Sequence, residues 1–264
     1  MDLQLRGKTA LVTGSTAGIG LSIAKTLAQE GVEVILNGRN KGRVDALVHQ
    51  LTAELPGTRF RGIAADFSQV DEINALLAEL PQIDILINNV GIFEPKEFTQ
   101  ISDEDWFKFF EVNVMSGVRL SRHYFPKMLT SGWGRIIFIS SESALQIPTE
   151  MIHYGTTKTA QLAISRGLAE LTTGTEVTVN TVLPGPTLSE GVSNFISSMA
   201  ASRHVSVEEM EKDFFQHARP TSIIKRFATT QEIANLVAYL SSPLASATNG
   251  AAVRVDGGVT KTIA

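Results

Sequence analysis

The sequence contains no cysteine. A chain without thiols forms no disulfide, holds no metal through thiolates and has no cysteine nucleophile. Its first residues, Met1 to Arg6, lack the basic start and apolar stretch of a secretory signal peptide. No uninterrupted apolar run is long enough to cross a bilayer. These absences predict a protein of the reducing cytoplasm that has no membrane partner.

A surplus of positive charge is also missing, because 27 Asp and Glu residues outnumber 23 Lys and Arg residues and the net charge is -4. Binding to nucleic acid depends on surplus Lys and Arg, so nucleic acid is not expected as a main partner. The five His residues show no metal-ligand spacing, and no metal site is predicted. The 264 residues, 43% of them hydrophobic, suit one large α/β domain over residues 1–264.

Apolar runs of strand length alternate with segments of helical periodicity along the chain. Repeated strand–helix units predict a parallel sheet with helices on both faces and right-handed crossovers. The predicted strands are 9–13, 32–36, 60–64, 83–87, 135–139, 176–182 and 251–255. The predicted helices are about 19–27, 41–55, 70–80, a long stretch after Ser102 toward 129, 153–171 and 231–240.

One segment, between Leu188 and Arg226, breaks this alternation because it carries no strand pattern. Long insertions of weak structure are often lids over a site. A helical insertion on the surface explains the segment equally well. We therefore expect a substrate lid at 188–226, with the surface insertion as the alternative.

Glycines cluster directly after the first predicted strand and before the first helix, in the spacing Gly-x-x-x-Gly-x-Gly. Glycines let the backbone turn sharply and let a pyrophosphate approach the helix N-terminus, where free N–H groups point outward. A turn in this place predicts a dinucleotide site. Its residues are Gly14, Ser15, Thr16, Ala17, Gly18, Ile19 and Gly20.

The end of the second predicted strand indicates which dinucleotide binds. An acidic residue there bonds the 2′-hydroxyl of NAD, whereas an Arg accommodates the 2′-phosphate of NADP. Gly38 offers no carboxylate and Arg39 offers a fork of donors that suits a phosphate. The sequence therefore favours NADP(H) over NAD(H). The alternative is that Arg39 is a solvated loop residue.

Motifs along essentially the whole chain resemble the short-chain dehydrogenase/reductase family. The glycine turn is similar to the family's Thr-Gly-x-x-x-Gly-x-Gly, and Asn-Asn-Val-Gly at 88–91 resembles its Asn-Asn-Ala-Gly. Tyr-Gly-Thr-Thr-Lys at 154–158 matches its Tyr-x-x-x-Lys, and Asn180 with Pro184-Gly185 resembles its motif on the sixth strand. The resemblance implies a single doubly wound Rossmann-type domain with a parallel sheet of about seven strands.

The resemblance also implies a catalytic set of Asn113, Ser141, Tyr154 and Lys158. Tyr154 and Lys158 are spaced i,i+4, so they share one helix face. An ordinary phenol has a pKa of about 10, and the Lys158 ammonium would favour the phenolate, so that Tyr154 can give and take a proton. Ser141 would hold the substrate oxygen. Asn113 would hold a water that relays protons.

The expected cofactor contacts continue beyond the glycine turn. Asp66 is placed to accept from the adenine amino group, and Phe67 to cover the ring face. Val90 departs from the family's Ala, and the loop around Thr187 departs from its usual pattern. The expected contacts outside the turn are Arg39, Asp66, Phe67, Asn88, Val90, Gly91, Tyr154, Lys158, Pro184, Gly185 and Thr187. Because Ala17 stands where many NADP-using relatives have a basic residue, the preference for NADP depends on Arg39.

Two functions remain open. The leading hypothesis is an NADP(H)-dependent oxidoreductase for a ketone, aldehyde or secondary alcohol, with a 3-oxoacyl-type ketone as one candidate substrate. The alternative is a nucleotide-sensing binding protein without turnover. The substrate end carries polar groups whose roles the sequence leaves open, namely Glu142, Gln146, Glu150, Met151 and His153. The resemblance further implies a homo-oligomer, a tetramer or a dimer.

Overall fold

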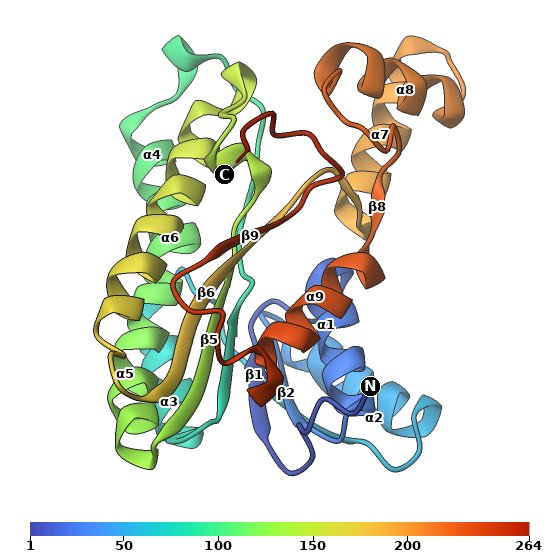
Figure 1. Ribbon diagram of the computed structural model, residues 1–264. Coiled ribbons are helices and arrows are strands. Elements are labelled where there is room, and N and C mark those ends of the chain that lie inside the picture. Colours follow the sequence, from blue (N-terminus) through green and yellow to red (C-terminus); the bar gives the residue numbers. More distant parts are fainter. Residues whose placement is uncertain (264) are drawn as a thin grey trace.

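A single parallel sheet of seven strands forms the centre of the protein, whose computed structural model describes residues 1–263 (Figure 1). The strands are β1 (Thr9–Val12), β2 (Glu33–Gly38), β3 (Arg59–Ala64), β4 (Ile85–Asn88), β5 (Trp133–Ile139), β6 (Glu176–Pro184) and β9 (Ala252–Val255). Their order is β3-β2-β1-β4-β5-β6-β9, and every pair is parallel. The predicted fold class is confirmed. The order reverses between β1 and β4, which is where open α/β sheets bind ligands.

Helices cover both faces of the sheet. They are α1 (Gly18–Gln29), α2 (Lys41–Glu54), α3 (Val70–Glu79), α4 (Asp103–Phe110), α5 (Ser116–Ser131), α6 (Ile152–Glu170), α7 (Glu190–Arg203), α8 (Val207–Asp213) and α9 (Thr230–Ser241). α1, α2 and α9 lie on one face, and α3, α5 and α6 on the other (Figure 1). Every helix among residues 1–263 is too short or too polar to span a bilayer.

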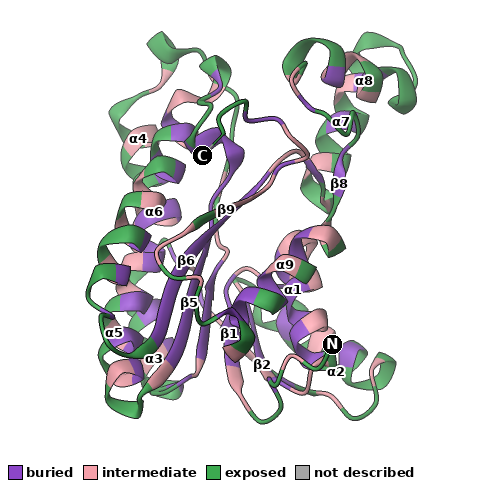
Figure 2. Cartoon of the chain, viewed as in Figure 1, coloured by how far each residue is buried: buried purple, intermediate pink, exposed green. Residues whose placement is uncertain are grey.

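The core consists of two apolar clusters, one on each face of the sheet (Figure 2). Successive side chains of a strand point to opposite faces. In β2, Val34 and Leu36 therefore belong to the first cluster and Ile35 to the second. Because both faces are covered, the central strands are apolar at nearly every position, which is the pattern that made them recognisable.

The long helical stretch predicted after Ser102 is confirmed, with one irregular turn inside it. The Ser102 hydroxyl accepts from the Asp105 backbone N–H at 3.2 Å and begins α4. Between α4 and α5, residues Glu111–Met115 form a π-helical turn. Such turns widen a helix and often occur at functional sites. This one carries Asn113, whose side chain is buried.

The insertion between Leu188 and Arg226 is helical. It contains α7 and α8 and a π-helical turn at Phe214–Ala218. A small apolar core is formed by Ile196, Ala200, Met210 and Phe215 of the insertion together with Phe227, which directly follows it. A two-stranded parallel sheet, β7 (Thr187–Leu188) with β8 (Ala228–Thr229), joins the insertion to the rest of the chain. In Figure 1 the insertion lies beyond the carboxyl ends of the main strands.

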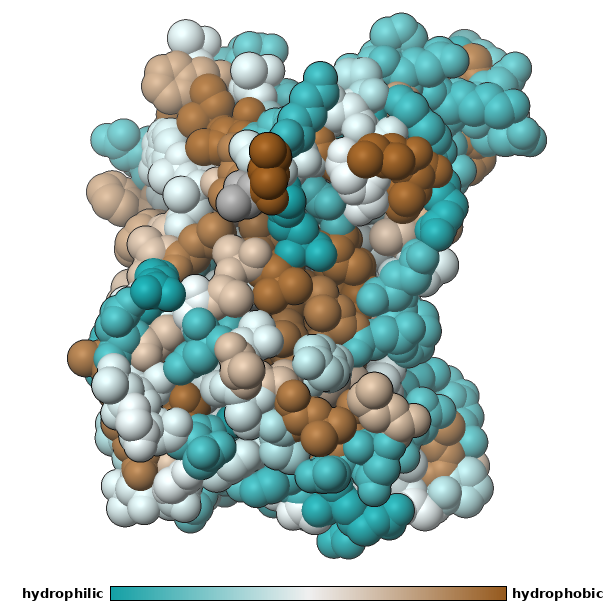
Figure 3. All heavy atoms as spheres, viewed as in Figure 1, coloured by the Kyte–Doolittle hydropathy of each residue, from teal (hydrophilic) through white to brown (hydrophobic). Residues whose placement is uncertain are grey.

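The strand β9 forms one edge of the main sheet and is covered by no further strand of this chain among residues 1–263. Its residues are exposed or half-buried. Figure 3 shows apolar side chains gathered in the middle of the face on which β9 lies. Unpaired strand edges are a natural place for contact with another chain.

Candidate active site

The glycine turn after β1 is pinned by a side chain of β2. The Gly14 N–H donates to Asn37 Oδ1 at 3.1 Å, and the Ser15 hydroxyl accepts from the Asn37 N–H at 2.9 Å. Gly14 and Gly18 have φ angles of +60° and +57°, in the left-handed region that glycine adopts freely. The buried Asn37, which was not among the predicted site residues, therefore helps to fix the shape of the turn.

The third glycine of the turn, Gly20, is needed for a different reason. A Cβ at this position would lie 2.5 Å from the Gly14 carbonyl oxygen and 2.6 Å from Asn89 Nδ2. That amide nitrogen is fixed in place, since it donates to the carbonyl oxygens of Thr13 and Gly14 at 2.9 and 3.1 Å. Only glycine allows α1, β1 and the loop after β4 to approach this closely.

A cavity of about 420 Å³ opens beside the glycine turn. It is lined by Thr16, Ala17, Gly18, Ile19, Gly20, Arg43, Asn89, Ser189, Glu190, Gly191 and Asn194. The cap residue of α1, Ala17, makes no side-chain hydrogen bond to the first turn. The N–H groups at the start of α1 are thus available to an anion, and the residues present fit the pyrophosphate of a dinucleotide.

Arg39 directly follows β2 at the predicted adenosine end of this site. Its side chain is exposed, and it forms no ion pair within residues 1–263. Arg43, in the first turn of α2, lines the cavity, and its Nη2 lies 3.5 Å from Glu190 Oε2 of the insertion. Arg43 was not among the predicted contacts, and its place in the first turn of the helix that follows Arg39 is the only sequence signal that could have indicated it.

Asp66 lies in the turn after β3, whereas the side chain of Phe67 is buried in the core. One carboxylate oxygen of Asp66 accepts from the N–H and the hydroxyl of Ser68, both at 2.9 Å, so Asp66 also shapes the turn after β3. The Phe67 side chain is 3% exposed and belongs to the core cluster of α3 and α5. The expectation that its ring covers the adenine is therefore wrong for this conformation, because neither ring face is open.

The segment 88–91 after β4 runs between the glycine turn and the catalytic candidates. Asn88 Nδ2 donates to the Ser121 hydroxyl at 3.4 Å, and its buried Oδ1 has no partner among residues 1–263. The Val90 N–H donates to the Thr13 hydroxyl at 3.1 Å. A Cβ on Gly91 would lie 3.3 Å from Lys158 Nζ, so the Gly91 backbone lies directly beside that ammonium.

The structure brings the four predicted catalytic residues to one edge of the sheet. Ser141 follows the end of β5, Tyr154 and Lys158 lie in the first turns of α6, and Asn113 comes from the π-helical turn. Lys158 Nζ lies 5.6 Å from the centre of the Tyr154 ring and donates to the Ile139 carbonyl oxygen at 2.9 Å. The shared helix face predicted from the i,i+4 spacing is present.

The Asn113 side chain ties three segments together. Its Oδ1 accepts from the Ile92 N–H at 2.7 Å, and its Nδ2 donates to the Ile92 carbonyl and the Thr157 hydroxyl, both at 3.0 Å. Gln161 donates to the Asn113 backbone carbonyl at 2.5 Å. Both amide hydrogens are thus in use. A water held by this side chain, as the sequence analysis expected, would have only the second lone pair of Oδ1 to bond.

Burial dominates the protonation of Tyr154 and Lys158. It raises the pKa of the Tyr154 phenol, and the Glu142 carboxylate raises that pKa further, while Ser141 and Arg219 act in the opposite direction. Burial also lowers the pKa of Lys158 to about 8, against the influence of Glu142. In the protein alone, burial therefore outweighs the lowering expected from the ammonium, and the pKa of the phenol lies above its ordinary value.

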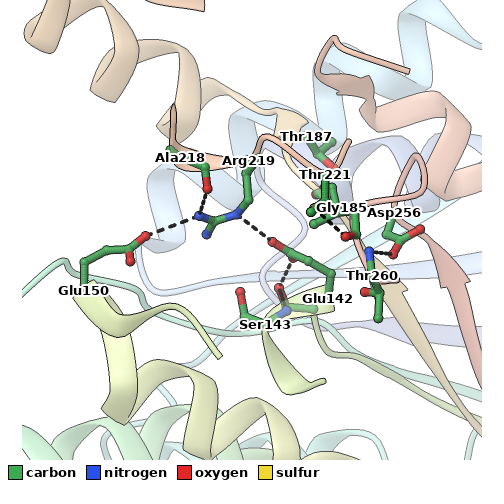
Figure 4. Close-up of polar contacts among 12 residues, drawn as sticks. Glu142, Ser143, Glu150, Gly185, Thr187, Ala218, Arg219, Thr221, Asp256 and Thr260 are labelled. Carbon is green, nitrogen blue, oxygen red and sulfur yellow. Dashed lines mark hydrogen bonds and ion pairs between the residues drawn. The ribbon is translucent and has the colours of Figure 1, made fainter. Parts of the chain in front are cut away.

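A carboxylate directly adjoins the predicted catalytic serine. The Ser141 hydroxyl donates to Glu142 Oε2 at 2.5 Å. Arg219, from the insertion, places its Nε 3.3 Å from Glu142 Oε1 and its Nη1 3.3 Å from Glu150 Oε1 (Figure 4). The roles of Glu142 and Glu150 could not be read from the sequence, and Arg219 was not among the predicted site residues. No local pattern could have shown it, since 77 residues separate Arg219 from Glu142.

The remaining candidates lie at the rim of the site or away from it. His153 is fully buried, with its ring centroid 4.1 Å from that of Phe109, and burial lowers its pKa. It is therefore not a base for the site. Thr187 is buried and donates to the Gly185 carbonyl oxygen at 2.9 Å. Among residues 1–263, no group of three His, Asp or Glu side chains is placed to hold a metal ion.

Known proteins show the same sequence pattern and the same fold. Residues 8–200 match the model of the short chain dehydrogenase family. An uncharacterized oxidoreductase of Bacillus subtilis (strain 168), YvaG, is 51% identical over 263 residues, which cover 100% of both chains. A 3-oxoacyl-[acyl-carrier-protein] reductase of Aquifex aeolicus is 32% identical and covers 98% of this chain and 100% of its own.

Among solved structures, the L-sorbose reductase of Gluconobacter frateurii, complexed with NADPH and L-sorbose, superimposes with a TM-score of 0.93. It is 31% identical, and the match covers 100% of each chain. The family match extends over most of the chain, and the relatives align with it from end to end. The chain therefore belongs to the short-chain dehydrogenase/reductase family, whose members are NAD(P)-dependent oxidoreductases acting on CH–OH and C=O groups.

Proposed function

We propose that this protein is an NADP(H)-dependent reductase that transfers a hydride between the nicotinamide and a carbonyl carbon, with Tyr154 as the proton donor and acceptor. The observation that carries the proposal is the convergence of Ser141, Tyr154 and Lys158 at the carboxyl edge of the sheet. The cavity at the glycine turn opens at the same edge. A nicotinamide and a phenol can thus meet one substrate.

Different residues of the site would bind different parts of the cofactor. The glycine turn and the start of α1 would hold the pyrophosphate, and Lys158 the ribose hydroxyls next to the nicotinamide. Arg39 would hold the 2′-phosphate, because its guanidinium is exposed and has no carboxylate partner within residues 1–263. The bound cofactor supplies or accepts the hydride. The solved complexes of an L-sorbose reductase and of an actinorhodin polyketide ketoreductase with NADPH support this choice.

The chain's own residues manage the proton. In the direction of reduction, the Tyr154 hydroxyl gives its proton to the carbonyl oxygen as the carbon receives the hydride, and the alcohol forms. Burial keeps this phenol protonated in the free protein, so it begins as a donor. The ammonium of Lys158 then stabilises the phenolate that is left. Ser141 orients the oxygen by donating a hydrogen bond to it.

We further propose that the chain acts as a single domain whose insertion, residues 188–226, is the lid of the substrate site. Arg219 of the insertion reaches the residue next to Ser141, which supports this role. A homo-oligomer is proposed as well. No further strand lies beside the edge strand β9 among residues 1–263, and α4 exposes Phe107 and Phe110, so β9 offers an unpaired strand edge and α4 an apolar surface to another copy.

The decisive experiment follows NADPH and NADH absorbance with a panel of ketones and aldehydes, for the natural protein and for Tyr154→Phe. We expect Tyr154→Phe to lower kcat by roughly a hundredfold to ten-thousandfold, the usual range for a lost proton donor. The Kd for NADPH should stay within about threefold, since the ring remains. Tyr239→Phe, at an exposed position on α9, is the matched control. Tight NADPH binding without turnover of any carbonyl would instead support a nucleotide sensor.

A further inference from the structure

The strongest feature that the proposed mechanism leaves unused is the group formed by Glu142, Arg219 and Glu150. Glu142 is 5% exposed, and the Arg219 side chain is 12% exposed, so both are nearly withdrawn from water. Glu150 is half-exposed at the outer end of the group. Buried ionised groups are costly unless something in the site uses them or pairs with them.

Glu142 competes with a substrate for the Ser141 hydroxyl. A serine hydroxyl has one hydrogen to donate, and here it goes to Glu142 Oε2 at 2.5 Å. When that hydrogen turns to a substrate carbonyl, the carboxylate oxygen loses its partner in a place that water hardly reaches. A substrate that brings its own hydrogen-bond donor to this oxygen avoids that loss.

Arg219 supplies the complementary half of a binding site. Its Nε and Nη1 are used by Glu142, Glu150 and the Ala218 carbonyl, whereas Nη2 has no hydrogen-bond partner among residues 1–263. A carboxylate acceptor and a guanidinium donor thus lie side by side (Figure 4). A hydroxyl group both donates and accepts, so it matches this pair of groups without carrying a charge.

Other substrate chemistries fit the group less well. Two carboxylates and one guanidinium leave a net charge of -1, which opposes an anionic substrate next to Ser141. An alkyl chain placed here would leave the Glu142 oxygen without any partner. Sites built to bond a hydroxyl reject analogues that lack it far more strongly than apolar pockets reject an added methylene.

We propose that Glu142 and Arg219 bind a hydroxyl group on the carbon next to the reacting carbonyl, so that the substrate is an uncharged hydroxylated ketone or aldehyde. This inference rests on the proposed function and deepens it. Glu142 is thereby a specificity-determining residue: its carboxylate releases the Ser141 hydroxyl for the carbonyl oxygen when the substrate hydroxyl takes its place.

The test compares kcat/KM with NADPH for hydroxyacetone, methoxyacetone, butanone and an acetoacetyl thioester. Methoxyacetone keeps the electron-withdrawing oxygen but cannot donate, so it isolates the hydrogen bond from intrinsic reactivity. We expect the natural protein to prefer hydroxyacetone over methoxyacetone on the order of 100-fold. Equal rates for these two, or a preference for the thioester, overturn the inference while leaving the proposed carbonyl reduction intact. If no carbonyl consumes NADPH, both proposals fail.

The variants Glu142→Gln and Glu142→Leu test whether the preference for hydroxyacetone over methoxyacetone depends on Glu142. Both should reduce the hydroxyacetone-to-methoxyacetone ratio to below about tenfold. Any change that Glu142 causes at Tyr154 affects both substrates equally and cancels in the ratio, so a merely structural role leaves the ratio unchanged and overturns the inference. Arg219→Gln provides the same readout should either Glu142 variant fail to fold. Glu170→Gln, an exposed position far along α6, is the matched control and should keep the natural ratio.

Discussion

The ammonium of Lys158 donates a 2.9 Å hydrogen bond to the carbonyl oxygen of Ile139, the last residue of β5. The bond fixes the ammonium beside the Gly91 backbone and 5.6 Å from the centre of the Tyr154 ring. The Lys158 side chain is buried, and a neutral carbonyl does not compensate fully for lost water. The free protein therefore holds a positive charge at a free-energy cost.

This cost gives the stability of the protein a particular pH dependence. Below pH 8, Lys158 is charged in both states and the full cost of its burial is present; as pH rises through the folded pKa of about 8, the folded protein loses the proton and the cost is relieved. Stability should therefore rise between pH 7.5 and 9.5. The gain of the natural protein over Lys158→Met should be about 2 kcal/mol, measured by urea unfolding at both pH values.

The sign of this dependence separates Lys158 from Tyr154. The phenol has a raised pKa in the folded protein, so the unfolded chain releases its proton first and stability falls above pH 10. The interval up to pH 9.5 therefore reports mainly on Lys158. Parallel pH curves for the natural protein and Lys158→Met would contradict the assignment.

Gly20 should tolerate no side chain. In Gly20→Ala the new Cβ would lie 2.5 Å from the Gly14 carbonyl oxygen, a backbone atom that cannot move without distorting the glycine turn. We expect a loss of about 2 kcal/mol or more in the free energy of unfolding, and weaker NADPH binding because the turn must move. Thermal unfolding and fluorescence titration with NADPH measure the two effects.

Gly167→Ala is the control for that substitution. Gly167 lies in the interior of α6, is exposed, and a Cβ there meets nothing within 4 Å. The change should stabilise the protein by about 0.5–1 kcal/mol, because alanine loses less backbone entropy in a helix. If both alanine variants behaved alike, the close approach at Gly20 would not be the reason for its glycine.

The elements that the sequence predicted well are those whose local residue pattern directly reflects how they are packed in the folded protein. The inner strands β1, β2, β4, β5 and β6 are largely buried on both faces, so they read as apolar runs, whereas the edge strand β3 exposes Arg59 and Arg61. The predicted bounds differ from the observed ones by only a few residues. The cap at Ser102 was readable because capping needs only residues three apart. The insertion gave no such pattern, since its small core combines α7, α8 and Phe227 across a long stretch of chain.

In the candidate site, too, residues that belong to a local motif were predictable and residues that act across the fold were not. Tyr154, Lys158 and the glycine turn were predictable because each motif lies within one element and its first neighbours. The supports of the site were not, because Asn37, Asn89 and Arg219 act on segments that only the fold brings near them. Phe67 was misjudged for a related reason: its place after β3 suggested the cofactor, but its ring fills the core under α3.

Arg39 should decide which nicotinamide cofactor is preferred. In Arg39→Ser the Kd for NADPH should rise by roughly 10- to 100-fold, the usual value of a charge-assisted bond to phosphate, while the Kd for NADH changes little. Isothermal titration with each nucleotide measures the ratio. Arg122→Ser, at an exposed position on α5, is the matched control. An unchanged NADPH affinity would shift the phosphate contact to Arg43, which lines the same cavity.

Substitution of Asn113 should lower the stability of the fold as well as kcat. Asn113→Ala removes the side-chain partner of the Ile92 N–H and carbonyl and the bond that the Thr157 hydroxyl accepts, which should cost roughly 2–3 kcal/mol in the free energy of unfolding. Asn113→Asp keeps the acceptor for Ile92 but places a second carboxylate oxygen 3.0 Å from the Ile92 carbonyl, so it should be no more stable.

The exposed Asn235→Ala, whose amide bonds only Gln231 on the same helix, is the control and should change stability by less than about 0.5 kcal/mol. Urea unfolding of the three variants gives these values, and kcat measured well below each midpoint separates folding from function. Because the Asn113 side chain fixes the loop that carries Gly91 against Lys158, kcat should fall even where the protein is fully folded. Folded Asn113→Ala with the natural kcat would mean that this loop keeps its position without the amide, and the role of Asn113 would be confined to stability.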